Sequence, residues 1–368
     1  MKIPFVDLHS QYLSIKNDID NAIFDVINET AFIGGKYVNK FEEEFSKLYG
    51  VKHCISVANG TDSLFIIMKM LGIGAGDEVI TVCNSWISTS ETISLTGAKP
   101  VFVDIDPFYY TINEDEIEMK ITPRTKAIIP VHIFGQVCDM EKIMSLSQKY
   151  NLPIIEDCAQ SHFSEFNGQR VGTFGIASSF SFYPGKNLGA YGDAGCILTN
   201  FDEMAYKFKM FSRHGALKKH EHIIEGINSR LDGIQAAILC SKLPHIIKWT
   251  DLRREKAILY RKYLSINTYI VLPIERENSL HSYHLFVIRV QNRDSLIEYL
   301  KKYEVEVAIH YPKILPNLKA YEYLNYKSSD FPIANLYQEE ILSLPIYPEI
   351  SDSQIKYVCD KINSFYNI

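Results

Sequence analysis

The sequence lacks a long apolar run, paired cysteines and any strongly basic stretch. No apolar run approaches the roughly 20 residues that a helix needs to cross a membrane. The formal net charge is -6, and the lysines and arginines form no cluster that resembles a nucleic-acid footprint. The chain also has no internal repeat and no low-complexity tract. We therefore expect a protein that acts on neither membranes nor nucleic acids.

The cysteines argue against two further classes of protein. All seven are scattered, their number is odd, and none forms a C-x-x-C pair. This pattern is not typical of a disulfide framework or a zinc site, so we expect no metal and a reducing compartment. No apolar segment precedes the first acidic residue, Asp7, and this predicts that there is no signal peptide. We therefore expect a cytoplasmic protein.

What the chain does have is a regular alternation of short β-rich runs and helical patterns. Its 368 residues, 46% hydrophobic and 22% charged, are enough for two globular domains. Strands are predicted at 54–58, 78–82, 100–104, 126–131, 152–157, 177–183 and 196–199, and helices at 11–28, 61–71, 88–96 and 139–150. The alternation predicts an α/β fold with a mostly parallel central sheet and helices on both faces.

The pattern changes from about residue 229. Two helices are predicted at 234–243 and 246–264, followed by strands at 284–290 and 305–311 and helices at 294–303 and 353–365. This order is typical of a smaller α+β domain attached to a long helix. We place the large domain at residues 1–245 and the small C-terminal domain at residues 246–368.

Ligands of parallel sheets bind beyond the carboxyl ends of the strands, and two chemically capable residues lie at such ends. Asp157 ends an apolar strand, and Lys186 follows the strand that begins at Ala177. A lysine that forms a Schiff base and a carboxylate that keeps a pyridine nitrogen protonated are what pyridoxal 5'-phosphate (PLP) requires of a protein. Either residue alone is more simply explained as a solvated surface group. A free lysine has a pKa near ~10.4, so burial, a nearby cation or imine formation must lower it for base catalysis.

Residues around this pair add to the pattern. The run 58–63 joins a strand to a helix, where Gly60 and the free N–H groups of the first turn suit a phosphate. The alternative is an ordinary helix cap made by Thr61 or Asp62. Ser181 could donate a hydrogen bond to the same phosphate, while Gln160 follows Asp157 by three residues and could contact the ring or its hydroxyl.

Trp86 follows the strand at 78–82 and carries a flat indole that can stack on a pyridine ring. The alternative explanation of Trp86 is a packed core aromatic.

The order and spacing of these motifs together resemble the DegT/DnrJ/EryC1/StrS family of PLP-dependent sugar aminotransferases. The similar motifs are Asn59-Gly60-Thr61-Asp62, Gly76-Asp77-Glu78-Val79-Ile80, Glu156-Asp157-Cys158-Ala159-Gln160, Ser181 to Lys186, and Asn228-Ser229-Arg230-Leu231-Asp232 with Gln235-Ala236-Ala237. The resemblance extends from Ile3 to Pro345. It implies the three-layer fold of PLP-dependent transferases, with a smaller C-terminal domain.

The resemblance also implies roles for individual residues. Gly60, Thr61 and Ser181 hold the cofactor phosphate, Trp86 stacks on the ring, Asp157 pairs with the ring nitrogen, Gln160 contacts the region of the ring hydroxyl, and Lys186 is the Schiff-base lysine. Asn228 reaches the phosphate from the second subunit of a homodimer, Arg230 binds the carboxylate of the amino donor, and His310 and Tyr311 line the sugar-nucleotide pocket. An inter-subunit ion pair is the alternative for Arg230.

The chain departs from the family in two places. The family often has alanine-histidine-glycine-alanine where this chain has Ser161-His162-Phe163-Ser164, and the stretch 86–91 also differs from the common pattern. Both departures concern the wall of the site, so they bear on the substrate and leave the lysine and the aspartate unaffected.

The implied reaction is a transamination in which L-glutamate leaves as 2-oxoglutarate and a nucleotide-linked keto sugar receives the amino group. The stretch 183–193 resembles the branch that acts at C3 of dTDP-3-keto-6-deoxyhexoses, and such deoxyamino sugars serve polysaccharide or natural-product biosynthesis. The run 228–232 also fits the branch that acts on UDP-linked 3-keto sugars, and amination at C4 is a further alternative.

Two alternative hypotheses assume the same fold but a different activity. Related sugar 3-dehydratases have histidine in place of the lysine, so the presence of Lys186 counts against dehydration. A non-catalytic regulator that binds PLP or a nucleotide sugar is the last alternative, and it would be marked by loss of Lys186 or Asp157.

Overall fold

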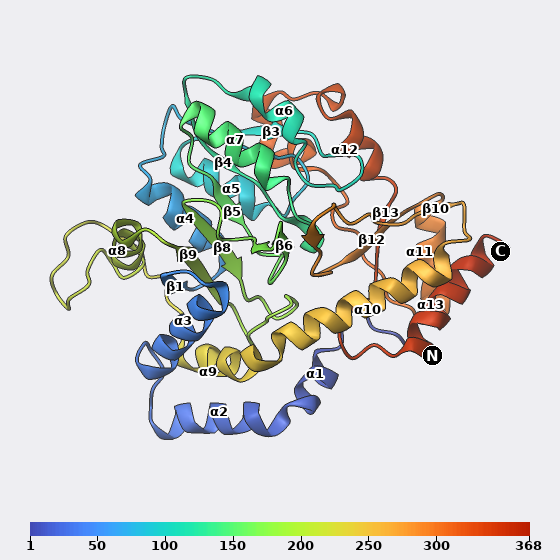
Figure 1. Ribbon diagram of the computed structural model, residues 1–368, viewed down its shortest axis with the longest axis horizontal. Helices are drawn as coiled ribbons and strands as arrows, with labels where there is room; N and C mark the ends of the chain where they lie inside the picture. Colours follow the sequence, from blue (N-terminus) through green and yellow to red (C-terminus); the bar gives the residue numbers. More distant parts are fainter.

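The computed structural model describes residues 1–368 and consists of a central β-sheet covered by helices, with a smaller lobe near both chain ends (Figure 1). The central strands are β1 (His53–Val57), β2 (Glu78–Val82), β3 (Lys99–Val103), β4 (Thr125–Ile129), β5 (Ile155–Asp157), β8 (Ala177–Ser181) and β9 (Gly195–Thr199). They form two hydrogen-bonded groups in the orders β1-β9-β8-β5 and β3-β2-β4. Parallel bridges from Ile128 to Ile154 and from Val131 to Asp157 join the two groups.

The prediction of a mostly parallel sheet is confirmed. Neighbouring strands run parallel except at β9, which is antiparallel to both β1 and β8. The apolar residues of β2, β4 and β9 alternate between two core clusters, as the pleat requires. In β2, Val79 packs in one cluster and Ile80 in the other, and both are fully buried. The strands read as continuous apolar runs because both faces of the sheet are covered.

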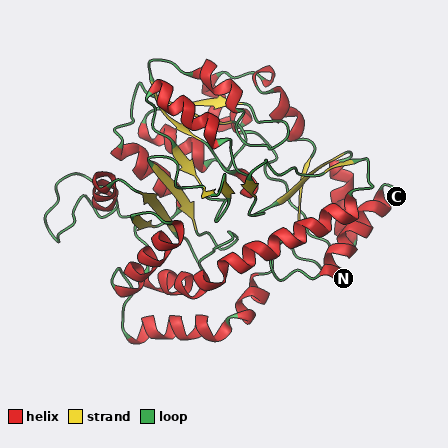
Figure 2. Ribbon diagram, viewed as in Figure 1, coloured by secondary structure: helices red, strands yellow, loops and turns green.

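Helices cover both faces of the sheet, as Figure 2 shows. The helices α4 (Gly60–Met70), α5 (Ser88–Thr96) and α8 (Asp202–Phe211) contribute buried residues to one core cluster. The helices α3 (Lys36–Tyr49), α7 (Met140–Tyr150) and α9 (Gly233–Lys242) contribute to the other. The three layers match the predicted fold class.

The predicted helix at 11–28 is in fact two helices, α1 (Leu8–Ser14) and α2 (Lys16–Asn28). Asp7 caps α1 by accepting a hydrogen bond from the Ser10 N–H at 2.9 Å. Ile15 leaves the helical conformation with φ -131° and ψ 26°, and its side chain is buried in the core. Burial of Ile15 therefore breaks a pattern that appears continuous in the sequence.

The C-terminal lobe is built on the long helix α10 (Ile246–Leu264). It contains β10 (Ile270–Val271), β12 (Phe286–Val290), α11 (Arg293–Lys302), β13 (Ile341–Leu344) and α13 (Asp352–Phe365). Its antiparallel sheet has the order β10-β12-β13, and Ile3 from the N-terminus packs in its core.

The predicted strand at 305–311 is wrong. Val305 forms a single bridge with Ile3, and Ala308 forms one with Ser343, so the stretch has no continuous partner. β13, which the sequence pattern did not indicate, supplies the third strand of the lobe instead.

The segment that follows residues 305–311 and precedes β13 packs against the central sheet. Its apolar residues, from Ile314 through α12 (Pro332–Tyr337), pack in the core cluster that also contains α3 and α9. The short elements α6 (Glu114–Ile117), β6 (Glu165–Phe166), β7 (Gln169–Arg170) and β11 (Ser279–Leu280) complete the fold, with β11-β6-β7 forming a small sheet. The domain boundary between residues 245 and 246 stays a prediction.

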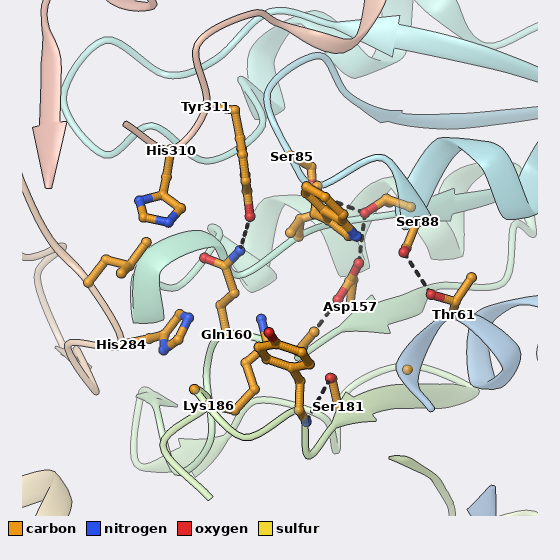
Figure 3. A pocket seen from close by; sticks show the side chains of 18 of the residues that line it. Thr61, Ser85, Ser88, Asp157, Gln160, Ser181, Lys186, His284, His310 and Tyr311 are labelled. Carbon is orange, nitrogen blue, oxygen red and sulfur yellow. Dashed lines mark hydrogen bonds between the residues drawn. The ribbon is translucent and has the colours of Figure 1, made fainter. Parts of the chain in front are cut away.

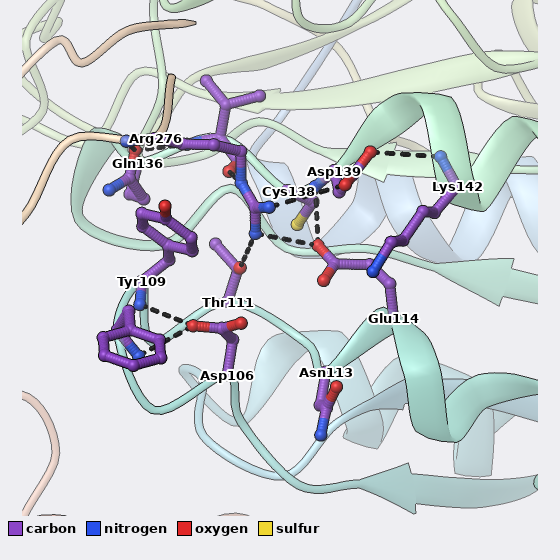
Figure 4. Close-up of polar contacts among 12 residues, drawn as sticks. Asp106, Tyr109, Thr111, Asn113, Glu114, Gln136, Cys138, Asp139, Lys142 and Arg276 are labelled. Atoms are coloured by element: carbon purple, nitrogen blue, oxygen red, sulfur yellow. Dashed lines mark hydrogen bonds and ion pairs between the residues drawn. The ribbon is translucent and has the colours of Figure 1, made fainter.

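A largely buried arginine, Arg276, ties the segment between β10 and β11 to the central part of the molecule (Figure 4). Arg276 donates hydrogen bonds to Glu114 Oε1 at 3.1 Å and to the Val137 carbonyl at 3.1 Å. Its guanidinium lies 4.2 Å from the centroid of the Tyr109 ring and 3.6 Å from Asp139.

None of the helices in the structure has the length and apolar character of a membrane span.

Candidate active site

A cavity of about 560 Å³ lies at the carboxyl ends of β2, β5 and β8. Residues of the N-terminal segment and of the C-terminal lobe close its outer side, among them Phe5, His284 and His310. Nine of the predicted site residues line this one cavity: Gly60, Thr61, Trp86, Asp157, Gln160, Ser181, Lys186, His310 and Tyr311. Figure 3 shows Thr61 and Ser88 at one side, His284 and His310 at the other, and Lys186 between them.

The N-terminus of α4 forms one end of the cavity. The Asn59 side chain caps the helix by accepting from the Asp62 N–H at 2.7 Å, so the proposed caps at Thr61 and Asp62 are wrong. The N–H groups of Gly60 and Thr61 make no hydrogen bond in the structure. A Cβ atom on Gly60 would lie 2.8 Å from Ser181 Cβ, so only glycine allows the helix to approach β8 this closely.

Hydroxyl groups surround these free N–H groups. Thr61 Oγ1 lies 2.7 Å from Ser88 Oγ, and Ser181 faces the same end of the cavity. Free backbone N–H groups at a helix N-terminus, with hydroxyls beside them, bind phosphate well. The arrangement therefore fits a phosphate monoester.

Asp157 is a buried carboxylate and not the solvated acid that the sequence left open. Its Oδ2 accepts from Thr89 Oγ1 at 2.8 Å, and its Oδ1 accepts from the Ala159 N–H at 3.1 Å. Burial raises the pKa of Asp157, while the hydrogen bonds from Thr89 and Ala159 act in the opposite direction. A positively charged ring nitrogen beside this carboxylate would favour its ionised form.

Lys186 lies in the turn between β8 and β9 and points into the cavity (Figure 3). Its Nζ forms no hydrogen bond and no ion pair within the chain. Burial lowers the pKa of Lys186 to about 8, against the opposing effect of the charge on Asp157. Because a neutral amine is both the nucleophile and the base, this lowered pKa is what base catalysis by a lysine requires.

The turn that carries Lys186 is held from both sides of the molecule. Asn187 Nδ2 donates to the Ser282 carbonyl at 3.0 Å, and Lys242 Nζ of α9 donates to the Gly189 carbonyl at 2.7 Å. A Cβ atom on Gly189 would lie 2.3 Å from the Pro184 carbonyl oxygen, so the turn requires glycine there. The position of Lys186 is therefore determined by the surrounding fold.

Gln160, Tyr311 and Trp86 form a wall above Asp157. Gln160 Oε1 accepts from the Phe134 N–H at 2.8 Å, and its Nε2 donates to the Tyr311 hydroxyl at 2.9 Å. The rings of Trp86 and Tyr311 lie 5.8 Å apart at an angle of 44°. Trp86 is 57% exposed and borders the cavity, so the alternative of a packed core aromatic is wrong.

Two histidines face the cavity as neutral rings. His310 Nδ1 lies 2.9 Å from Ser343 Oγ, and the ring stacks on Phe5 with 5.7 Å between centroids. Burial lowers the pKa of His310 to about 4, and it lowers the pKa of His284 well below its usual value. Both side chains can therefore exchange hydrogen bonds with a ligand without adding charge.

Among the cavity residues for which the sequence indicated no role are Phe5, Ser88, Thr89, Arg253 and His284. Ser88 and Thr89 open a helix that follows the predicted strand at 78–82, and their place at the shared edge of the sheet could have identified them. The other three are brought to the cavity by segments far away in the sequence.

Asn228 and Arg230 do not line the cavity of their own chain. Both side chains are exposed, and Asn228 forms an isolated bridge with Arg213. Within a single chain these two residues therefore lie apart from the other predicted site residues.

A model of the DegT/DnrJ/EryC1/StrS aminotransferase family matches residues 13–363. A dTDP-3-amino-3,6-dideoxy-alpha-D-galactopyranose transaminase of Aneurinibacillus thermoaerophilus is 43% identical over 363 residues, 99% of each chain. A protein of Geobacillus stearothermophilus called a pleiotropic regulatory protein is 41% identical over 368 residues, 100% of this chain and 99% of its own. A UDP-2-acetamido-2-deoxy-3-oxo-D-glucuronate aminotransferase of Pseudomonas aeruginosa is 40% identical, with 97% of this chain and 98% of the relative covered.

Solved structures have the same fold. The structure of Streptomyces venezuelae DesV in complex with a ketimine intermediate gives a TM-score of 0.97 at 34% identity, covering 100% of this chain and 99% of DesV. The structure of NtdA from Bacillus subtilis with bound cofactor PMP gives a TM-score of 0.89 at 30% identity, covering 99% of this chain and 85% of NtdA. The fold class predicted from the sequence is confirmed.

Proposed function

The chain belongs to the DegT/DnrJ/EryC1/StrS aminotransferase family, and on that premise we propose that it transfers the amino group of L-glutamate to C3 of a dTDP-3-keto-6-deoxyhexose. It is a sugar-nucleotide aminotransferase that depends on PLP. The observation that carries the proposal is that Lys186, Asp157 and the free N–H groups of Gly60 and Thr61 face one cavity.

The residues present fit the cofactor. Gly60, Thr61 and Ser181 would hold its phosphate, and Ser88 adds a hydroxyl to that set. Asp157 would hold the ring nitrogen in its protonated form, and Trp86 would cover the ring. When bound, the cofactor supplies the electron sink through which an amino group leaves one carbon and joins another.

Lys186 has the two properties that this chemistry asks of the chain. Its Nζ is unpartnered, so it is free to bond the cofactor and, once released, to carry a proton between substrate and cofactor carbons. Its pKa of about 8 is close to neutral pH, and a group with such a pKa can both accept and give up a proton there. Gln160 is fixed by Phe134 and Tyr311 and would keep its hydrogen-bonding edge in place during this exchange.

The preference for a dTDP-linked 6-deoxy sugar rests on two supports. The stretch 183–193 resembles the branch that acts at C3 of such sugars, and relatives with the corresponding names are 43% and 34% identical to the chain. Phe5, Val6 and Ile346 give the cavity lining an apolar part, to which the neutral His310 adds no charge. An apolar wall favours a methyl group at C6 over a hydroxymethyl group.

A UDP-linked 3-keto sugar is the second candidate acceptor. Relatives named for UDP-linked substrates are 40% and 39% identical, which is close to the identity of the dTDP-sugar relatives.

A purely regulatory role is not favoured, because both Lys186 and Asp157 are present in the same cavity. The cytoplasmic location stays a prediction from the cysteine pattern, in which all seven cysteines are free thiols.

We also propose a homodimer with shared sites, in which Asn228 reaches the phosphate and Arg230 the donor carboxylate in the partner's cavity. Both residues are exposed and lie outside their own cavity. Large apolar side chains are exposed on the segments around them, namely Phe32, Ile33, Leu217, Ile223 and Ile224. Exposed apolar groups that gather in this way mark an interaction surface. Mixing inactive Lys186 and Asn228 variants should then restore some activity, and a purely additive loss would contradict shared sites.

The proposed function is tested with the purified protein, PLP and the two substrates in turn. A visible absorbance band of lysine-bound cofactor that L-glutamate converts to the amino form establishes the donor half-reaction. Adding dTDP-linked and UDP-linked 3-keto and 4-keto sugars to the amino form then identifies the acceptor by recovery of the band. A band that L-glutamate does not convert would refute glutamate as the donor.

A further inference from the structure

Arg253 on α10 is a buried cation in the cavity wall. It is 4% exposed and borders the same cavity as Lys186. Its Nη1 donates to the carbonyl oxygens of Ile346 at 2.8 Å, Tyr283 at 3.1 Å and His284 at 3.4 Å. Its Nε is buried without a partner, and Nη1 makes all of its hydrogen bonds, so Nη2 is also free.

The charge of Arg253 has no counter-ion. No carboxylate lies within the 4.0 Å of an ion pair, although the more distant Glu349 acts on its pKa. Burial lowers the pKa of Arg253 to about 10, so the guanidinium is still charged at neutral pH. Glu349 is itself partly buried, and burial raises its pKa. A buried charge without a partner is costly, and folded proteins retain one where a ligand completes it.

The position of Arg253 separates it from the phosphate end of the cavity. Two of its acceptors belong to His284 and Ile346, which also line the cavity. His284 lies across Lys186 from Thr61 and Ser88, the residues at the phosphate end (Figure 3). The anion that Arg253 suits is therefore not the cofactor phosphate but a group near the reacting atoms on the opposite side.

The free edge of Arg253 has the shape of a carboxylate site. Nε and Nη2 lie on one edge of the planar guanidinium, and their parallel N–H groups match the two oxygens of a carboxylate. Nη1, which holds the three carbonyls, lies away from this edge. The chain thus uses one part of the side chain to fix its position and leaves the other part unpartnered.

We infer that Arg253 binds the α-carboxylate of the amino donor through its Nε and Nη2 edge. The inference rests on the proposed function, since L-glutamate is the donor there. Glutamate has two carboxylates, and the exposed Arg230, offered to the partner's cavity, is suited to the second. The α-carboxylate belongs to Arg253 because it is attached to the carbon whose proton Lys186 would move. Donors with one carboxylate should accordingly be poor substrates.

The test measures binding of glutarate, a dicarboxylate that cannot be transaminated, to the PLP-loaded protein by calorimetry. Arg253→Met should weaken glutarate binding by at least about thirtyfold, because one partner of a desolvated charge pair is lost. Glutarate and the monocarboxylate butyrate should then bind with similar affinity. Arg253→Lys, which keeps the charge, should recover part of the loss.

Arg254→Met is the matched control. Arg254 neighbours Arg253 on α10 and also donates to a backbone carbonyl, that of His281 at 3.1 Å, but it does not line the cavity. Its variant should bind glutarate within about twofold of wild type, as expected for a surface substitution. Unchanged glutarate binding by Arg253→Met, or an equal loss in Arg254→Met, would overturn the assignment.

A crystal structure of the wild-type protein with PLP and glutarate decides the matter if the Arg253 variants do not fold. A glutarate carboxylate on the Nε and Nη2 edge supports the inference, and both carboxylates placed elsewhere reject it. The same materials distinguish this inference from the proposed function. A wild-type protein that binds glutarate through Arg253 but does not convert L-glutamate would refute the proposed function and leave the carboxylate site in place.

Discussion

Arg276 and Arg253 are both largely enclosed between the central part of the molecule and the C-terminal lobe, yet their charges are compensated differently. Arg276 has two carboxylates close by, Glu114 at 3.1 Å and Asp139 at 3.6 Å, and an aromatic ring against its face. Arg253 has only backbone carbonyls, and part of its guanidinium is without a partner. A compensated buried charge joins elements of the fold, while an uncompensated one marks a place for a ligand.

The difference extends to the surroundings of each arginine. Around Arg276 every charge has a partner within the chain. Around Lys186 several groups have no hydrogen-bond partner, including the N–H groups of Gly60 and Thr61 and the Nζ of the lysine itself. Unsatisfied groups concentrate at functional sites, where the ligand supplies what the fold leaves out. Substitutions in the two regions should therefore separate loss of function from loss of stability.

The largest effect is expected from Lys186→Ala. Turnover should fall by more than about a thousandfold, because the nucleophile and proton carrier is removed. Thermal stability should not fall, since the Nζ makes no bond within the chain and burial disfavours its charged form. The absorbance conversion by L-glutamate and a thermal melt measure the two quantities. Retained transamination would remove Lys186 from its role, and a large loss of stability would blur the contrast between the two regions.

Arg276→Met should give the opposite result. It leaves the buried Glu114 without its ion-pair partner, and breaking such a pair costs about 3 kcal/mol or more. Urea unfolding measures this loss. Adding Glu114→Gln should recover part of it, and the control Lys142→Met, which breaks the exposed pair with Asp115, should cost less than about 1 kcal/mol. Arg276→Met protein that stays folded should keep its donor half-reaction. A variant that is fully stable but inactive would contradict the assignment of Arg276 to the fold.

Much of this contrast could not be predicted from the sequence. The strands of the central sheet could be, because buried parallel strands are continuous apolar runs, and Asp157 and Lys186 stand at their ends. The strand predicted at 305–311 failed because its pairing depends on Ile3 and Ser343, which are distant in the chain.

Arg253 shows the same limit within the site. In sequence it is one of two adjacent arginines on a long helix, and nothing local separates it from Arg254. Only the packing of α10 against residues 283–284 and 346 turns Arg253 inward. The residues that could be predicted are those whose position follows from a strand end, and the missed ones are those that tertiary packing brings in.

The pH dependence of stability in the PLP-free protein tests the unpartnered state of Lys186. Its pKa is about 8 in the folded chain and near ~10.4 when unfolded, so between these values the unfolded chain binds more protons. Stability should therefore rise with pH across this window, by up to about 3 kcal/mol, and the rise should be absent in Lys186→Met. Urea unfolding of both proteins measures it, and taking their difference cancels the contribution of Lys242. Parallel curves for the two proteins would show that the lysine is not desolvated.

The smallest effect is expected from Ser88→Ala, at the other end of the cavity. Ser88 Oγ lies 2.7 Å from Thr61 Oγ1, so each hydroxyl has the other as a partner before any phosphate binds. Losing one hydroxyl from a charged phosphate site should weaken PLP binding by about tenfold, while the rate at saturating PLP stays close to wild type. Ser94→Ala, on the same helix but outside the cavity, is the control. Unchanged PLP affinity would place the phosphate away from Ser88. A tenfold loss with an intact rate would show that this end of the cavity binds the cofactor and that Ser88 takes no part in the chemical step, in contrast to Lys186.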